Sequence, residues 1–177
     1  MTDHILILGG ARSGKTSFAE RLAMRMGQSP AYLATAEALD AEMQARVASH
    51  REQREGRFMT IEEPLDLPEA LEAASQTHDV ILVDCLTLWI SNLLGAERDV
   101  TQAVDDLVDA LEAIESTRVL LVSNEVGLGI VPDNALARAF RDLSGWSHQR
   151  LAGVCADVYF VAAGLPLVMK GSAPLLD

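Results

Sequence analysis

The chain has 177 residues, of which 49% are hydrophobic, and its formal net charge is −12 at pH 7. This length predicts one domain, residues 1–177, with a core of its own, and the acidic balance disfavours a nucleic-acid partner, which would need a basic face. We expect no membrane span, no signal peptide and no disulfide framework from Cys85 and Cys155, and therefore a cytoplasmic protein.

The first element in chain order is a glycine-rich loop between a strand and a helix. Residues 5–8 form a short branched apolar run, typical of a buried parallel strand, and the apolar side chains after Thr16 recur at helical spacing. Backbone N–H groups of such a loop, together with the positive end of the helix, bind phosphate. Lys15 is expected to reach the β- and γ-phosphates and Thr16 to bind Mg²⁺. The loop matches G-x-x-x-x-G-K-[ST] with Gly9, Gly10, Ala11, Arg12, Ser13, Gly14, Lys15 and Thr16.

A second strand is expected at residues 31–36, counting its exit loop, and a helix at residues 39–56. On that helix His50 is surrounded by Arg46, Arg51 and Arg54. Three arginines would lower the pKa of the imidazole, keep it nucleophilic and bind phosphate oxygens, which suits a histidine that attacks phosphorus. A solvated charged face, in which acidic side chains pair the arginines, explains the same spacing.

The next strand, residues 79–84, ends in a carboxylate. Asp84 is expected to be the second Mg²⁺ ligand, and it could also cap the segment 86–94, which reads as helix or turn. A short helix is expected at 67–74 and an amphipathic helix at 100–114.

Residues 118–123 form a further apolar strand, after which Asn124 and Glu125 are expected to face the ligand crevice; an ordinary connecting loop is the alternative. A helix at 134–151, capped by Asp133 or Asn134, and an edge hairpin of strands 158–162 and 167–170 complete the chain. Alternating strands and helices predict an α/β fold of the P-loop NTPase type, with a mostly parallel sheet, helices on both faces and a C-terminal edge hairpin. Ligands bind such folds at the carboxyl ends of the strands.

From end to end the chain resembles the bifunctional adenosylcobinamide kinase / adenosylcobinamide-phosphate guanylyltransferase family of cobalamin synthesis. The resemblance rests on the glycine loop and on five further motifs: Tyr32-Leu33-Ala34-Thr35-Ala36; Asp40-x-Glu42-Met43-x-x-Arg46-x-x-x-His50; Asp84-Cys85-Leu86-Thr87-Leu88-Trp89; Asn124-Glu125-Val126-Gly127-x-Gly129-Ile130-Val131-Pro132; and Arg138-x-Phe140-Arg141-Asp142.

The resemblance implies two reactions. The enzyme would phosphorylate the aminopropanol hydroxyl of adenosylcobinamide with ATP or GTP, and then transfer GMP from GTP to that phosphate through a guanylyl group on His50. Lys15 and His50 would be catalytic, Thr16 and Asp84 would hold Mg²⁺, and the enzyme would be a homotrimer. The implied nucleotide site includes, besides the glycine loop, Ala34, Thr35, Ala36, Arg51, Glu52, Gln53, Arg54, Glu62 or its neighbour Glu63, and Asp84.

The chain departs from the family pattern at three positions. Many members have His-His where this chain has Ser49-His50, asparagine where His148 stands, and some have glutamate for Asp84. A single-activity P-loop kinase, with a structural His50, and a nucleotide-binding switch without turnover are the alternative functions. Retention of α-phosphate label on His50 would separate the first hypothesis from both.

Overall fold

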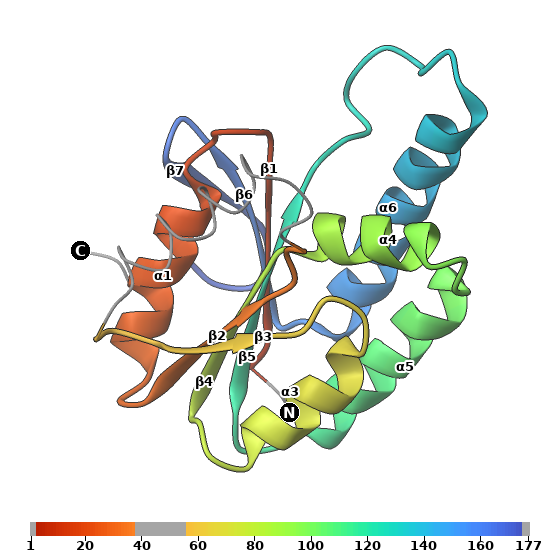
Figure 1. Cartoon of the computed structure of the whole chain (residues 1–177). Coiled ribbons are helices and arrows are strands. Elements are labelled where there is room, and N and C mark those ends of the chain that lie inside the picture. The colour runs from red at the N-terminus through yellow and green to blue at the C-terminus, as the bar shows by residue number, and fades with distance from the viewer. Residues whose placement is uncertain (1–2, 38–55, 175–177) are drawn as a thin grey trace.

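The computed structural model describes residues 3–37 and 56–174, and these form one twisted sheet covered by helices on both faces (Figure 1). The strand order is β3-β2-β4-β5-β1-β6-β7. All neighbouring strands are parallel except β6 and β7, which form an antiparallel hairpin at one edge. The strands are β1 (Ile5–Gly9), β2 (Pro30–Ala34), β3 (Met59–Glu62), β4 (Val80–Asp84), β5 (Arg118–Asn124), β6 (Asp157–Ala162) and β7 (Leu165–Lys170).

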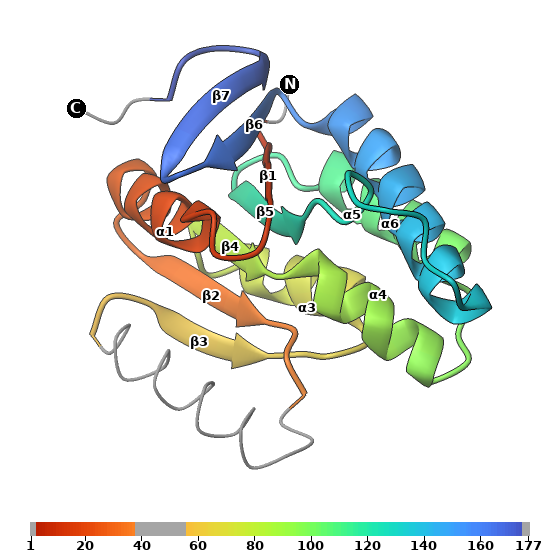
Figure 2. The same ribbon diagram turned by 90° about the horizontal axis from the view of Figure 1, so that it is seen from above.

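The described helices are divided unequally between the two faces, as Figure 2 shows. α1 (Lys15–Met26) covers one face, where Phe18 and Leu22 pack in a cluster with Ile5, Ile7 and Tyr32. The larger cluster lies on the other face. That face is covered by α3 (Leu67–Ser75), α4 (Leu86–Gly95), α5 (Val100–Ala113) and α6 (Ala135–Val154).

Local signals in the sequence explain where these helices begin. The Asp99 carboxylate accepts hydrogen bonds from the backbone N–H groups of Thr101 and Gln102, and the Asn134 side chain accepts one from Ala137. Asn134, not Asp133, therefore caps α6. Residues 86–95 are a helix, which resolves the alternative of a turn, and the predicted strands and edge hairpin are confirmed.

Three details differ from the sequence-based expectation. β3 was not predicted: it is four residues long and both its end residues are exposed, so it lacks the apolar run of a buried strand. β7 begins at Leu165 and not at residue 167, and α6 continues to Val154. The helix expected at 39–56 lies almost wholly outside the described residues. In the part of the chain that is described, no helix combines the length and apolar character needed to span a bilayer.

Candidate nucleotide site

The glycine loop lies between β1 and α1, at the carboxyl edge of the sheet. Gly14, immediately before α1, has φ +90°, a conformation that strongly favours glycine, and Arg12 also has a positive φ of 54°. A Cβ at Gly9 would lie 2.5 Å from the Val161 carbonyl oxygen. The two outer glycines of the motif are thus required by the backbone itself.

The turn of the β6–β7 hairpin braces this loop from behind. The Gly164 N–H donates to the Ser13 carbonyl at 2.7 Å, and a Cβ at Gly14 would come within 2.9 Å of the Gly164 Cα. Ala163 and Gly164 both have positive φ, as the central residues of a tight hairpin turn do. The C-terminal hairpin therefore contributes to the shape of the phosphate loop.

Thr16 and Asp84 meet at the start of α1. The Thr16 hydroxyl donates to Asp84 Oδ2 at 3.1 Å, and the buried Tyr32 hydroxyl donates to the same oxygen at 2.6 Å. Asp84 does not cap α4, whose N-cap is Cys85. The Thr16 hydroxyl and the Asp84 carboxylate are the hard oxygen ligands that Mg²⁺ prefers. In residues 3–37 and 56–174, no three acidic, histidine or cysteine side chains lie together as a ready-made metal site.

Lys15 is almost buried beneath the loop. Its ammonium donates to the Gly10 carbonyl at 3.1 Å. Burial lowers the pKa of Lys15, while the nearby Asp84 carboxylate opposes the shift. A phosphate would give this poorly solvated cation a stronger partner than one carbonyl oxygen.

The neighbouring strand ends bring further predicted residues to the same edge. The strand register aligns Ala34 with Asp84 on one side and with Glu62 on the other. Thr35 is buried, and its hydroxyl exchanges hydrogen bonds with the backbone of Cys85 at 2.8 and 3.0 Å, so its side chain joins the exits of β2 and β4. The Thr35 backbone N–H donates to the Asp84 carbonyl at 3.2 Å, and the Thr35 carbonyl accepts from Asn92 Nδ2 at 2.8 Å, so each polar group of Thr35 already bonds another part of the protein.

The structure separates the roles of Glu62 and Glu63. The Glu63 carboxylate accepts hydrogen bonds from the backbone N–H groups of Leu65 and Asp66, and therefore stabilises the turn that leads into α3. Glu62 is exposed at the end of β3, in line with Ala34. The Glu63 carboxylate thus has a structural partner in this turn, and the nucleotide contact predicted for Glu62 stays a prediction.

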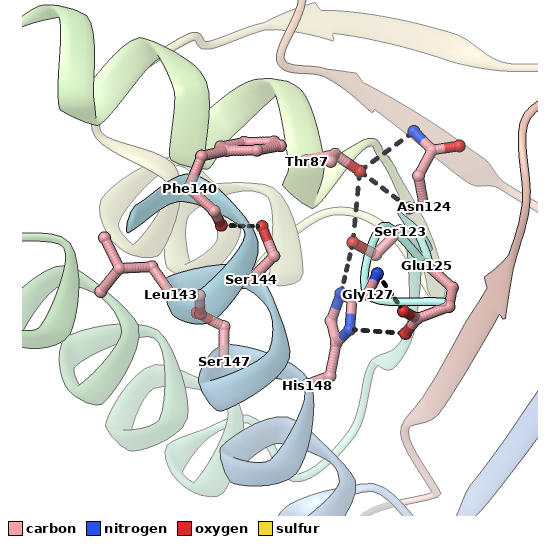
Figure 3. A network of polar contacts seen from close by, with 10 residues as sticks. All are labelled: Thr87, Ser123, Asn124, Glu125, Gly127, Phe140, Leu143, Ser144, Ser147 and His148. Atoms are coloured by element: carbon pink, nitrogen blue, oxygen red, sulfur yellow. Dashed lines mark hydrogen bonds and ion pairs between the residues drawn. The ribbon is translucent and has the colours of Figure 1, made fainter. Parts of the chain in front are cut away.

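A chain of polar groups lies under the end of β5 (Figure 3). Thr87 of α4 bonds Asn124, Ser123 bonds both Thr87 and His148 of α6, and His148 faces Glu125. Burial lowers the pKa of His148, and the Glu125 carboxylate opposes this. Asn124 and Glu125 lie at the carboxyl edge of the sheet, where the Glu125 N–H donates to the Gly9 carbonyl at 3.0 Å, but the Glu125 carboxylate turns to the Gly127 N–H and to His148.

His50 and the run Arg51, Glu52, Gln53 and Arg54 lie outside the described residues, so their predicted roles remain predictions. The sequence did not indicate that Tyr32 holds Asp84, or that Thr87 and His148 support Asn124. Tyr32 had one available signal, a hydroxyl-bearing side chain two residues before the strand end and hence on the same strand face as Ala34.

Comparison with known proteins shows the family. The family model described as cobinamide kinase / cobinamide phosphate guanyltransferase matches residues 5–169. The bifunctional adenosylcobalamin biosynthesis protein CobP of Pseudomonas aeruginosa is 48% identical over 169 residues, which cover 94% of this chain and 96% of the relative. The corresponding protein CobU of Salmonella typhimurium is 40% identical over 182 residues, covering 94% and 99%.

Solved structures with the same fold are much more distant in sequence. A KaiC-like protein from Pyrococcus horikoshii OT3 superimposes with a TM-score of 0.53 at 13% identity, covering 99% of this chain and 82% of the other. An ATPase from the type III secretion system of pathogenic bacteria gives 0.54 at 11% identity, covering 94% and 56%. At such identities the likeness shows the P-loop NTPase-like fold alone.

Proposed function

The chain belongs to the cobinamide kinase / cobinamide phosphate guanyltransferase family, and from this premise we propose how its own residues serve the two reactions of a bifunctional enzyme of adenosylcobalamin biosynthesis. In the first reaction the hydroxyl of the aminopropanol arm of adenosylcobinamide takes the γ-phosphoryl group of ATP or GTP, and the nucleoside diphosphate and the hydroxyl proton are released. In the second, GMP passes from GTP to that phosphate and pyrophosphate leaves.

The glycine loop serves the phosphates in this proposal. Its N–H groups and the start of α1 bind the phosphate chain, and Lys15 exchanges the Gly10 carbonyl for phosphate oxygens. Thr16 and Asp84 would hold Mg²⁺, which supplies charge neutralisation on the phosphates when it is bound. The contact between Thr16 and Asp84 carries this proposal, because it joins the loop to a carboxylate from another strand.

We propose that His50 carries the GMP group between the two substrates. Its nitrogen would attack the α-phosphorus of GTP, the bond to the β-phosphate oxygen would break, and pyrophosphate would leave with the electron pair. The phosphate of the corrinoid would then displace the histidine. The arginines around His50 in the sequence suit the charge that develops on the α-phosphate. Ala34, Thr35, Ala36, Arg51, Glu52, Gln53, Arg54 and Glu62 would complete the nucleotide site.

Two coarser features belong to the same proposal. We expect the enzyme to work in the cytoplasm, where nucleoside triphosphates are supplied, and to assemble as a homotrimer, as the family resemblance implies. The molecular mass in solution tests the second expectation.

The experiment is labelling with GTP that carries radioactive phosphorus at the α-position, followed by denaturing separation. Wild type should retain an acid-labile, base-stable label, and His50→Ala should retain none. His78→Ala is the matched control, because His78 lies at the amino end of the sheet, where Nδ1 contacts the Ser29 carbonyl, and it should label like wild type.

If wild type binds GTP but retains no label, the proposal of a guanylyl group on His50 is wrong. Nucleotide consumption stimulated by adenosylcobinamide would then leave a plain kinase, and its absence would leave a nucleotide-binding module.

A further inference from the structure

Asn124 lies between the two parts of the nucleotide site. β5 runs between β1, which carries the glycine loop, and β4, which ends at Asp84. Asn124 is the last residue of β5 and is in register with Gly9, while Val122, two residues earlier, is in register with Asp84. Asn124 is therefore level with the first glycine of the loop and just beyond the level of Asp84.

The Asn124 side chain begins on the same face of the sheet as the contact between Thr16 and Asp84. Leu120 and Val122 pack in the cluster with Phe18 of α1, whereas Val119 and Leu121 belong to the opposite cluster. Because side chains alternate along a strand, the Asn124 side chain starts on the α1 face. From there its amide nitrogen reaches across the strand end to Thr87 Oγ1 at 3.1 Å.

The donors and acceptors around Thr87 fix the direction of the hydrogen bonds that hold the Asn124 amide. Thr87 Oγ1 lies 2.8 Å from the Asn124 backbone N–H, 3.1 Å from Asn124 Nδ2 and 3.3 Å from Ser123 Oγ. A hydroxyl accepts two hydrogen bonds and donates one. With Asn124 donating twice, Thr87 must donate to Ser123, and Ser123 in turn donates to His148 Nε2 at 2.8 Å.

The neutral form of His148 agrees with this direction. Its Nδ1 faces Glu125 Oε2 at 3.9 Å, and a carboxylate favours a proton on the nitrogen that faces it. Nε2 is then unprotonated and accepts from Ser123. At the other end of this series of hydrogen bonds, the Asn124 NH₂ group turns to Thr87 and the Asn124 amide oxygen turns away from it, as Figure 3 shows.

We infer that Asn124 is a further substrate-contacting residue, whose Oδ1 accepts a hydrogen bond from an O–H group facing the γ-phosphate, and that His148 positions it through Ser123 and Thr87. Phosphate oxygens are acceptors, so an acceptor at this place matches a donor: the hydroxyl to be phosphorylated or a water bound to Mg²⁺. The inference rests on the proposed function, because it needs the kinase reaction to occur at this edge.

The test compares full-length variants in the kinase reaction with adenosylcobinamide. Asn124→Ala should lower kcat by about tenfold or more while the Kd for GTP changes by less than about twofold. Thr87→Val should act in the same direction, because the amide loses its acceptor, and Thr87→Ser should restore most of the rate. An increased Mg²⁺ requirement in Asn124→Ala would identify the donor as metal-bound water, and an increased KM for adenosylcobinamide would identify the substrate hydroxyl.

Ser147→Ala is the matched control. Ser147 is also buried on α6, one residue before His148, but its hydroxyl donates to the Leu143 carbonyl of its own helix. It should keep wild-type kcat. Thermal unfolding of every variant separates loss of rate from loss of fold.

The pH profile gives a second readout, which a purely structural role would not change. Among the described residues, Glu125 is the charged side chain that faces His148, and its carboxylate raises the pKa of His148. Burial has the larger effect and lowers this pKa. Protonation of His148 Nε2 at acid pH reverses the donors and acceptors from His148 through Ser123 and Thr87, and the Asn124 NH₂ group then turns outward. The acid limb of kcat due to His148 should therefore disappear in His148→Gln.

Wild-type kcat in Asn124→Ala, or equal impairment of Thr87→Ser and Thr87→Val, would overturn the inference while the proposed function stands. Absence of adenosylcobinamide phosphorylation by wild type would overturn the inference together with the kinase half of the proposed function, and retention of label on His50 would show that the guanylyl-transfer half survives.

Discussion

Two hydroxyls from different elements orient the carboxylate of Asp84. Thr16, at the start of α1, and Tyr32, on β2, both donate to Oδ2. Tyr32 is 3% exposed, so its hydrogen bond is shielded from water. Outer groups that hold a metal ligand raise metal affinity by fixing its direction, and Tyr32 is such a group for the proposed Mg²⁺ site.

Tyr32→Phe should therefore increase the Mg²⁺ concentration needed for half-maximal kinase activity by about tenfold. The free energy of unfolding should fall by about 1.5–3 kcal/mol, the usual net value of a hydrogen bond to a charged group. A Mg²⁺ titration of the initial rate at saturating GTP measures the first effect, and urea unfolding measures the second.

Tyr159→Phe provides the comparison, because Tyr159 is equally buried but its hydroxyl donates to the Ser172 carbonyl. It should lose about 1 kcal/mol of stability, the usual net value of a neutral hydrogen bond, and keep the wild-type Mg²⁺ titration. An unchanged titration in Tyr32→Phe would show that Asp84 needs no orienting group.

At this scale the sequence predicted the residues whose motif states their chemistry. The glycine loop and the expected partnership of Thr16 with Asp84 lie together in the structure. Tyr32, Thr87 and His148 could not be assigned, because their roles depend on partners 52, 37 and 25 residues away in the chain. Such pairs carry no local spacing signal.

Among the elements, the β6–β7 hairpin has a role beyond closing the edge of the sheet. Its turn donates one N–H to the glycine loop, and the close approach of Gly164 to Gly14 leaves no room for a side chain on Gly14. A change in the turn should therefore reach the phosphates without touching the loop sequence.

Gly164→Ala tests this connection. An alanine at φ +78° costs about 1 kcal/mol of stability, and relaxation of the turn should weaken GTP binding about threefold or more. Ala163→Gly relieves the positive φ of Ala163 in the same turn. It should therefore raise the free energy of unfolding, by up to about 0.5 kcal/mol once the entropy of glycine is subtracted. Denaturant unfolding and calorimetric GTP titration measure both. Lower stability of Gly164→Ala with unchanged GTP affinity would confine the turn to a structural role.

The elements that were predicted are those with a strong apolar period, such as α5 and the buried strands. β3 was missed because it lies at an edge of the sheet, and an exposed four-residue strand obtains its order from pairing with β2. The pairing of β3 with β2 places Glu62 beside Ala34. Without β3, the sequence could not predict this strand end of the candidate site.

For the whole molecule, the sequence predicted the class of fold but not the strand order. Placement of β5 between β1 and β4 depends on long-range pairing, and that order brings Asn124 between the glycine loop and Asp84. The polar groups of the candidate site gather at the carboxyl edge. The opposite edge contains a different buried polar group, His4, which serves stability.

His4 connects three elements at the amino edge of the sheet. The Val119 N–H donates to Nδ1 at 3.2 Å, so the proton of the neutral ring is on Nε2, which donates to the Leu111 carbonyl at 2.8 Å. The Ala156 N–H donates to the His4 carbonyl. Burial lowers the pKa of His4 from 6.5, and backbone hydrogen bonding to Leu111 only partly opposes this.

Among the described residues, His4 and His148 both make stability depend on pH below 6.5, because burial lowers both pKa values. Above pH 6.5 both rings are neutral in the folded and unfolded chains, and their contribution is constant. Below 6.5 the unfolded chain takes up protons first, so the free energy of unfolding falls until the folded pKa is reached, by about 1.4 kcal/mol per pH unit for each ring. Carboxylates with lowered pKa, such as Asp79, act near and below their ordinary value of 3.8, so they lie outside this window.

His4→Gln can accept from Val119 and donate to Leu111 without titrating, and it should therefore remove the His4 contribution, about 1.4 kcal/mol per pH unit, from the slope between pH 6.5 and the folded pKa. Urea unfolding at closely spaced pH values measures the slope, and an unaltered slope would show that His4 does not resist protonation in the folded chain.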